Sequence, residues 1–476
     1  MLNNPLIRRY RYSLMRPRQL WIYITIYVAI IALLLFLNYI AYTPQRTFHN
    51  PTYFFRSVSY QLFTLQALVL CLLAAANSGS AIREEVTGKS YDFFRMLPIS
   101  ASKKAVGILV GKNLVVLLLA AANFLLLIIF AILGQVAASL FVQSLLAIMS
   151  VALLTNSVAL LSSIKPVSKK RTSSIATLII LAFLLGPLVI RGLVAIWGID
   201  QIENITMKFY TIEVPIIILV SLVALYFSCW SITGVLRKFT REDEPLFSRT
   251  GAYLFMAGYE LVLLGLFYAP LTEATKIPNW ILNYCYWLIS LVPVLTVPLW
   301  SLRNFDKYLE HSGLIRSNST KSKGMILRML LYSNLSLDFG LFAIWAAGAI
   351  GTTLITGLEL LPHLYIILIL FSFYLFLMLL LEISVVFTPL SDKVGLLLGF
   401  FAAVYVILPI ILYGILESKT LYLHSPVGFL FGMFQKSHGE IAIQNSIWVI
   451  NLTLCVIPIV LISKRQLHIL RTRQKM

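Results

Sequence analysis

The chain has 476 residues, of which 59% are hydrophobic and only 12% charged, and its formal net charge is +19. About a quarter of the residues of a soluble domain are charged, so this composition excludes an ordinary soluble protein. Apolar runs of about 20 residues recur along the sequence, which is the length that crosses a bilayer as a helix. The alternating segments of a transmembrane β-barrel do not occur in the sequence. We therefore expect an all-α, polytopic transmembrane helical bundle.

In chain order, the apolar runs predict twelve membrane spans. The first run is too long for the core of a signal peptide, and we interpret it as a retained helix. The predicted spans lie near residues 20–42, 58–81, 105–133, 138–162, 174–198, 212–235, 250–270, 279–301, 332–356, 362–388, 394–416 and 443–463.

The basic residues predict the orientation, because Lys and Arg concentrate in cytoplasmic loops. With the N-terminus in the cytoplasm, all but seven of the 38 Lys and Arg residues fall on the inside. We therefore expect both termini to be cytoplasmic, in a multi-pass protein of the cell (inner) membrane of a bacterium. The inside bias and anionic lipid headgroups explain the net charge without a nucleic-acid partner. The seven outside residues are Arg46, Arg56, Arg191, Lys208, Lys276, Lys419 and Lys436.

A charged cytoplasmic linker at residues 239–249 divides the chain into two predicted domains. Residues 1–238 form a first six-span half with a cytoplasmic loop at 82–104. Residues 250–476 form a second six-span half with a cytoplasmic loop at 302–331. With an even number of spans in each, the halves are expected to share one topology as parallel repeats.

The two cytoplasmic loops share a short motif of the form Glu-x-[Ser/Thr]-Gly. It occupies Glu85 to Gly88 in the first loop and Glu310 to Gly313 in the second. A match this short also arises by chance, so the motif adds only modestly to the prediction of related halves.

The first loop also contains Gly88-Lys89-Ser90, which resembles the end of a phosphate-binding loop. That motif needs another glycine five positions before Gly88, where this chain has Arg83. Gly107 and Gly111 precede Lys112 with the wrong spacing and without a following Ser or Thr. The sequence also lacks HExxH and GxSxG patterns. We therefore expect no catalytic residue, bound cofactor or metal in this chain.

Residues 81–89 are predicted to form a short, separate cytoplasmic helix. The acids Glu84 and Glu85 come before the basic residues, an order that suits the helix dipole. Tyr91 belongs to an aromatic cluster that follows, and Pro98 would break the helix before the next span. We expect Glu85 to face solvent. The segment is either an interfacial helix anchored on lipid or a docking element for a soluble partner.

One family shows a similar arrangement. Glu84-Glu85-x-x-Gly88, then Tyr91, then Leu97-Pro98-Ile99-Ser100, resembles the loop after the second helix of ABC-2 type exporter permeases. The resemblance implies a coupling helix that seats in a cleft of a separate ATP-hydrolysing subunit. In it, Glu85 would contact the ATPase and Gly88 would permit close backbone approach. The implied coupling residues are Arg83, Glu84, Glu85, Gly88, Tyr91, Arg95 and Pro98.

The resemblance covers residues 1–160 best, and it implies an amphipathic connecting helix over Arg8–Gln19. A usual permease of this family has six spans and pairs with a second copy, so this chain resembles a fused pair. Its second loop lacks the Leu-Pro-Ile-Ser run, and a possible second coupling site would use Asp306, Glu310 and Gly313. The implied partners are two ABC ATPase subunits, which would bind the ATP and Mg.

Acids inside predicted spans are costly and are often functional. Glu260 and Glu382 are such intramembrane acids. They are either cation-coupling groups or structural hydrogen-bond partners of neighbouring helices, and the second interpretation is favoured because no Lys or Arg lies mid-span. The lone amides Asn113, Asn156 and Asn451 are expected to bond between helices.

Three functions are compatible with these patterns. The resemblance favours a permease subunit of an ABC exporter, which is not itself an enzyme, and the apolar composition suits a lipid-like, peptide or drug-like amphiphile as its unidentified substrate. An ion-coupled secondary transporter would instead rely on the intramembrane acids. A polytopic enzyme acting on lipid-linked substrates would need polar residues clustered on one membrane face, and the acids and histidines are scattered.

Overall fold

The computed structural model describes residues 4–42, 51–87, 98–164, 206–240, 246–273, 278–301, 334–387 and 455–456. The described part is mostly helical and divides into two compact units. The first unit comprises Met1–Lys208 and Ile212–Leu246, and the second comprises Phe209–Thr211 and Phe247–Met476. Each unit is described by itself below.

Within the described residues, nine helices are long and apolar enough to cross a membrane. These long apolar helices confirm the prediction of a helical, multi-pass membrane protein. The nine helices fall in nine of the twelve predicted spans. The predicted spans at 174–198 and 394–416 lie outside the described residues, and so does 443–463 apart from residues 455–456. Twelve spans with cytoplasmic termini therefore stay a prediction.

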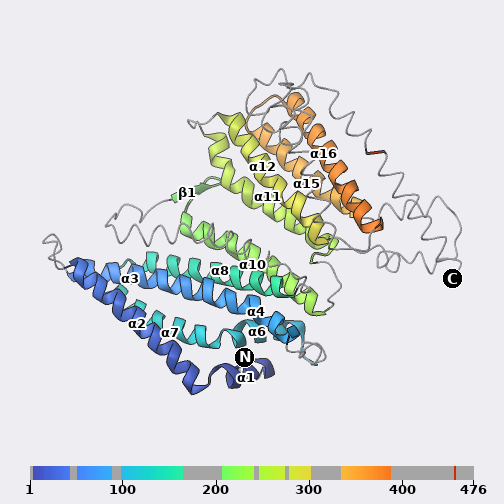
Figure 1. The fold of residues 1–476 in the computed structure, drawn as a ribbon. Coiled ribbons are helices and arrows are strands. Elements are labelled where there is room, and N and C mark those ends of the chain that lie inside the picture. The colour runs from blue at the N-terminus through green and yellow to red at the C-terminus, as the bar shows by residue number, and fades with distance from the viewer. Residues whose placement is uncertain are drawn as a thin grey trace, which may run out of the picture. The chain divides into compact units, whose positions relative to one another are not determined.

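In its described residues the first unit consists of helices and most of a β-hairpin, whose turn at Phe209–Thr211 belongs to the second unit (Figure 1). A single π-helical segment, η1, joins α3 to α4, so the helical backbone runs from Pro51 to Thr87 without a break. Its elements are α1 (Pro5–Leu14), α2 (Pro17–Tyr42), α3 (Pro51–Ala67), η1 (Leu68–Leu73), α4 (Ala74–Thr87), α6 (Ala101–Lys112), α7 (Leu114–Leu133), α8 (Ala138–Ser163), β1 (Thr206–Phe209), β2 (Ile212–Pro215) and α10 (Ile216–Thr240).

Three predicted spans differ clearly from the observed elements. The span at 58–81 is too short, because the helical backbone runs from Pro51 to Thr87. The span at 212–235 begins too early, because residues 212–215 form β2, which pairs with β1 around a turn where Tyr210 has a φ of 54°. The span at 105–133 is two helices, α6 and α7, that meet at Asn113. The Asn113 amide donates to the Ser78 hydroxyl at 2.9 Å and to the Leu109 carbonyl, contacts that hydropathy does not report.

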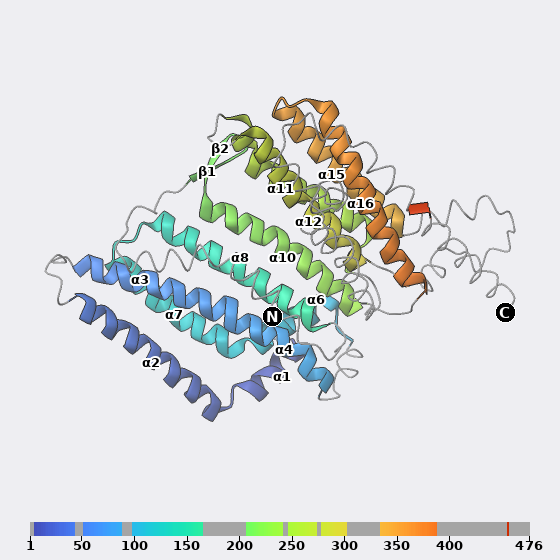
Figure 2. The ribbon, with the colours of Figure 1, turned by 45° about the horizontal axis from the view of Figure 1, so that its top comes forward.

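The core of the first unit forms where α8 packs between α4 and α10 (Figure 2). Buried amides join its helices. Asn123 on α7 donates to Gln66 and to the Leu62 carbonyl of α3, and it accepts from Tyr27 of α2. Buried polar groups need such partners, so these bonds fix how the apolar helices pair.

Asn156 on α8 makes a similar link to the π-helical segment. Its amide donates to the Leu70 carbonyl at 3.0 Å, and its side-chain oxygen accepts from Ser78 at 2.9 Å. The expected helix-to-helix bonding is confirmed for Asn156 and Asn113, whereas Asn451 lies outside the described residues. A π-helical turn interrupts the regular ladder of backbone bonds, and Asn156 bonds to a carbonyl within that turn.

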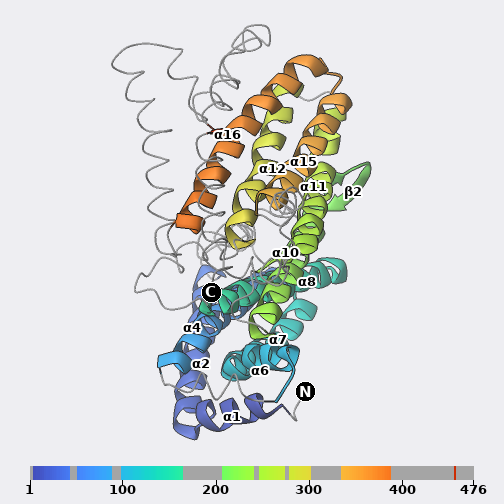
Figure 3. The same cartoon turned by 90° about the vertical axis from the view of Figure 1, so that its right-hand side faces the viewer.

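In the described residues of the second unit, four long helices run side by side (Figure 3). They are α11 (Arg249–Thr272), α12 (Asn279–Ser301), α15 (Asn334–Ile355) and α16 (Leu360–Phe387). Aromatic side chains fill the space between them, and Trp287 and Trp345 are among the largest fully buried ones. Each indole N–H is satisfied: Trp345 donates to the Trp287 carbonyl, and Trp287 donates to Thr352.

Candidate functional site

The residues of the predicted coupling loop lie at the end of α4 and before α6. Residues 81–87 are the last turns of α4, which begins at Ala74, so the prediction of a short, separate helix is wrong over this part. No proline interrupts the chain between the apolar run and Thr87, and the helix therefore continues. Arg83 is exposed on α4, and Pro98 is exposed in the bend before α6. Gly88, Tyr91 and Arg95 lie outside the described residues.

Glu85 is buried, with an exposed fraction of 6%, and the prediction that it faces solvent is wrong. The side chains that cover it come from α1. Arg9 Nη2 lies 3.0 Å from Glu85 Oε2, and the Tyr10 hydroxyl donates to Oε1 at 3.2 Å. Both carboxylate oxygens are therefore occupied within the chain, one by a charge and one by a phenol.

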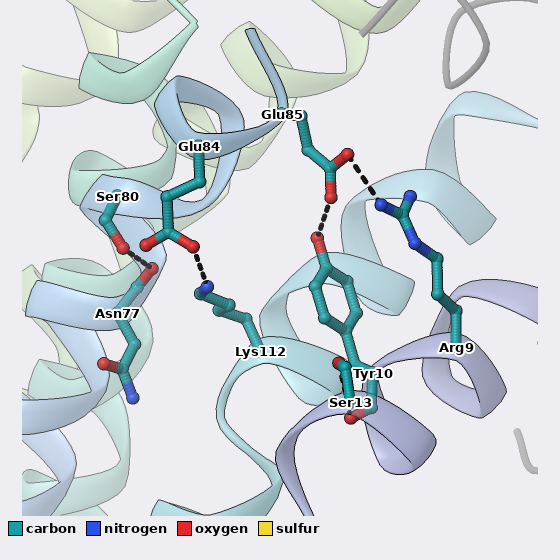
Figure 4. Close-up of polar contacts among 8 residues, drawn as sticks. All are labelled: Arg9, Tyr10, Ser13, Asn77, Ser80, Glu84, Glu85 and Lys112. Carbon is teal, nitrogen blue, oxygen red and sulfur yellow. Dashed lines mark hydrogen bonds and ion pairs between the residues drawn. The ribbon is translucent and has the colours of Figure 1, made fainter. Parts of the chain in front are cut away.

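Glu84 points toward Lys112, whereas the neighbouring Glu85 points toward Tyr10 and Arg9 (Figure 4). Glu84 forms an ion pair with Lys112, the last residue of α6. The Glu84 side chain is 57% exposed and that of Lys112 only 12%. The two adjacent acids thus hold two different elements: Glu85 holds α1 and Glu84 holds α6.

Two glycines of α6 allow α1 to approach closely. A Cβ at Gly107 would lie 2.9 Å from the Asn4 side chain, and a Cβ at Gly111 would lie 2.6 Å from Tyr10 Cδ2. Asn4 also caps α1 and donates to the Lys103 carbonyl at 2.7 Å. The spacing Gly-x-x-x-Gly is the usual signature of close helix packing, so the sequence carried a signal for this contact.

Tyr10 is the centre of the cluster. Its ring packs on Gly111, its hydroxyl donates to Glu85, and Lys112 Nζ lies 6.0 Å from its ring centroid. Burial, followed by the Glu85 carboxylate, raises the pKa of Tyr10 well above its usual value. The phenol therefore keeps its proton and remains a donor.

These contacts connect three helices: α1, the end of α4 and α6. Through Glu84 and Glu85, the end of α4 is joined to both α6 and α1, and Leu6, Tyr10, Ile82 and Ile108 share an apolar core beneath the charges. The connecting helix that the resemblance implies over Arg8–Gln19 does not match one observed helix, because residues 8–14 lie in α1 and residues 17–19 already belong to α2. The end of α4 is therefore in direct contact with both α1 and α6.

The other predicted site residues lie elsewhere. Glu260 is buried in α11, and the Tyr286 hydroxyl of α12 donates to its Oε2 at 2.5 Å. Glu382 lies in α16, but its side chain is outside the described part, as are Asp306, Glu310 and Gly313. Among the described residues, no group of His, Cys, Asp or Glu side chains could hold a metal ion.

Comparison with known proteins gives no further guide to the site. No protein-family model matches this chain, and no curated protein or solved structure matches it significantly.

Proposed function

We propose that this chain is the membrane-spanning permease subunit of an ABC exporter. It moves an unidentified, amphiphilic substrate with energy from a separate ATPase subunit, which binds the ATP and Mg. The observation that carries the proposal is the run from Glu84 to Ser100, which resembles the coupling loop of ABC-2 type permeases and follows a long membrane helix. Two such ATPase subunits, one below each half, are part of the proposal.

The geometry supports a transmission role for the cluster at the end of α4. The helical backbone from Pro51 to Thr87 is continuous, so force applied at its end acts along the membrane helix. The side chains exposed at the end of α4 and in the bend before α6 include Arg83, Glu84 and Pro98. Glu85 instead acts inside the chain, where it positions α1, and this revises the direct ATPase contact that the resemblance implies.

Association with an ATPase tests the proposal. The expected partner is a soluble ATPase encoded beside this gene, and it should co-purify with the intact chain in detergent. Arg83→Glu reverses an exposed charge at the end of α4 and should weaken the association at least about tenfold. Glu213→Lys is the matched control, because Glu213 is exposed on β2, which is predicted to face the other side of the membrane.

Two results would contradict the proposal. If the ATPase binds neither the intact chain nor the control, the chain is not its permease. If Arg83→Glu binds as well as the intact chain, the end of α4 is not the docking surface.

An ion-coupled secondary transporter is the second candidate, and one observation favours it. Glu260 is a buried carboxyl group in a membrane helix, a position where acids often belong to ion pathways. Transport by vesicles that contain this chain alone, driven by an ion gradient and indifferent to ATP, would select this candidate.

A further inference from the structure

Glu260 lies in the interior of the second unit. It sits near the middle of α11, a helix long and apolar enough to cross a membrane, and its exposed fraction is 7%. The helices α12 and α15 both pack against α11. A carboxyl group in such a place has lost nearly all its hydration, so its charged form is costly unless a cation compensates it.

Only one of its two oxygens has a hydrogen-bond partner. The Tyr286 hydroxyl donates to Oε2, whereas Oε1 has no partner within the described residues. Gly348 of α15 lies against the same carboxyl, since a Cβ there would be 2.9 Å from Oε2 and 3.1 Å from the Tyr286 hydroxyl. The absence of a side chain on α15 therefore makes room for the Glu260–Tyr286 pair.

No cation compensates Glu260 in the part of the chain that the structure describes. The titratable groups that interact with it are phenols, Tyr259 on its own helix and Tyr286 on α12, and Tyr210 at the tip of the hairpin lies near Tyr286. On α15 the nearest titratable group in sequence is Asp338, an acid. On α16, His363 bonds to the Glu359 carbonyl and packs against the rings of Tyr284 and Trp287.

We propose that Glu260 is an intramembrane proton-binding site. The carboxylate takes one proton from water at Oε1, the oxygen that accepts no hydrogen bond, and becomes a neutral carboxylic acid, while Oε2 continues to accept from Tyr286. No redox partner or second ion is required. The proposal is independent of the permease function, because it rests on the second unit alone.

Asn283 lies on the same face of α12 as Tyr286, and its Oδ1 is a second buried polar atom without a partner in the described residues. Asn283 precedes Tyr286 by one helical turn, and residues three apart share a helix face. Asn283 is fully buried and donates to Thr353 at 3.3 Å, but its Oδ1 has no partner within the described residues. Glu260 Oε1 and Asn283 Oδ1 are thus two buried acceptor atoms without a partner among the described residues of the second unit.

Infrared spectroscopy of the full-length protein in lipid nanodiscs tests the assignment. A protonated carboxyl has a C=O stretching band that a carboxylate lacks, and the band shifts in heavy water. At neutral pH we expect this band in the intact protein and its loss in Glu260→Gln. Glu213→Gln, at an exposed position on β2, is the matched control and should leave the band unchanged.

Tyr286→Phe provides a second variant that keeps the carboxyl. It removes the donor to Oε2, so the carboxyl band should move without being lost, and this result stands even if Glu260→Gln does not fold. The proposal is overturned if folded Glu260→Gln keeps the full band, or if Tyr286→Phe leaves its position unchanged. It is equally overturned if Glu260 is ionised and its carboxylate bands respond to sodium but not to choline, which would make the site a sodium site.

Discussion

Each unit contains a buried glutamate, and the two carboxyl groups differ in the side chains that compensate them. Both lose nearly all contact with water, and both accept a hydrogen bond from a tyrosine. Glu85, at the end of α4, also has Arg9 at 3.0 Å, and the arginine side chain is 44% exposed. Glu260, within α11, has no cation and keeps one oxygen open in the described part of the chain.

The difference follows from the position of each residue along its helix. At the end of α4 an arginine can reach the carboxylate while its own charge stays partly in water, so an ion pair is stable there. In the middle of α11 a cation would itself have to be buried, which costs several kcal/mol. The first site is therefore suited to holding elements together, and the second to exchanging a proton.

The largest expected loss of stability comes from disrupting the contact between α1 and α6. Gly111→Ala places a Cβ 2.6 Å from the Tyr10 ring, and we expect the free energy of unfolding to fall by about 2–3 kcal/mol, since the core cannot accommodate the added group. The measurement is chemical unfolding in detergent, together with protease cleavage near residue 15 to report release of α1.

Gly351→Ala is the matched control for this substitution. A Cβ at Gly351 meets no atom within 4 Å, and alanine is a better helix former than glycine by about 1 kcal/mol. We expect unchanged or increased stability. Equal losses from Gly111→Ala and Gly351→Ala would show that the contact between α1 and α6 is not responsible.

Removing Arg9 would make the first site resemble the second. Arg9→Ala removes the guanidinium 3.0 Å from the buried Glu85 carboxylate and keeps the Tyr10 hydrogen bond, and we expect a loss of about 1–2 kcal/mol, reduced from that of a fully buried pair because Arg9 is partly exposed. Arg8→Ala is the control, since Arg8 is exposed on the same helix, and it should change stability by less than about 0.5 kcal/mol. Chemical unfolding measures both variants.

A smaller effect is expected from Tyr10→Phe. The phenylalanine keeps the ring on Gly111 and removes only the 3.2 Å hydrogen bond to Glu85, while Arg9 still compensates the charge. We expect a loss of about 1 kcal/mol. If Tyr10→Phe costs as much as Arg9→Ala, the phenol rather than the ion pair holds α1 to α4, and the contrast between the two glutamates is weaker than described.

The smallest change in the free energy of unfolding is expected for the partly exposed Glu84–Lys112 ion pair. Glu84→Gln removes the ion pair with Lys112, and because the Glu84 side chain is mostly exposed we expect a loss below about 1 kcal/mol that shrinks further at high salt. Unfolding at low and high ionic strength measures it. A large, salt-independent loss would show that α6 depends on Glu84 as strongly as α1 depends on Glu85.

The membrane helices could be located from the sequence because their length is imposed by the bilayer. The span predicted at 279–301 coincides with α12, and that predicted at 138–162 differs from α8 by one residue. Apolar runs of this length have one stable form in lipid, the helix. The hairpin at 206–215 was missed because Ile212 to Pro215 are mostly apolar, and hydropathy does not distinguish a short strand from the start of a helix.

The sequence by itself determined the class of the protein, the ends of most membrane helices and the presence of acids where acids are costly. Only the tertiary structure decided what those acids contact. Glu85 is covered by Arg9 and Tyr10, which lie more than 70 residues away in the chain, and the gap over Glu260 is made by Gly348 on another helix. Burial and pairing depend on which helices pack together, and local sequence does not fix that packing.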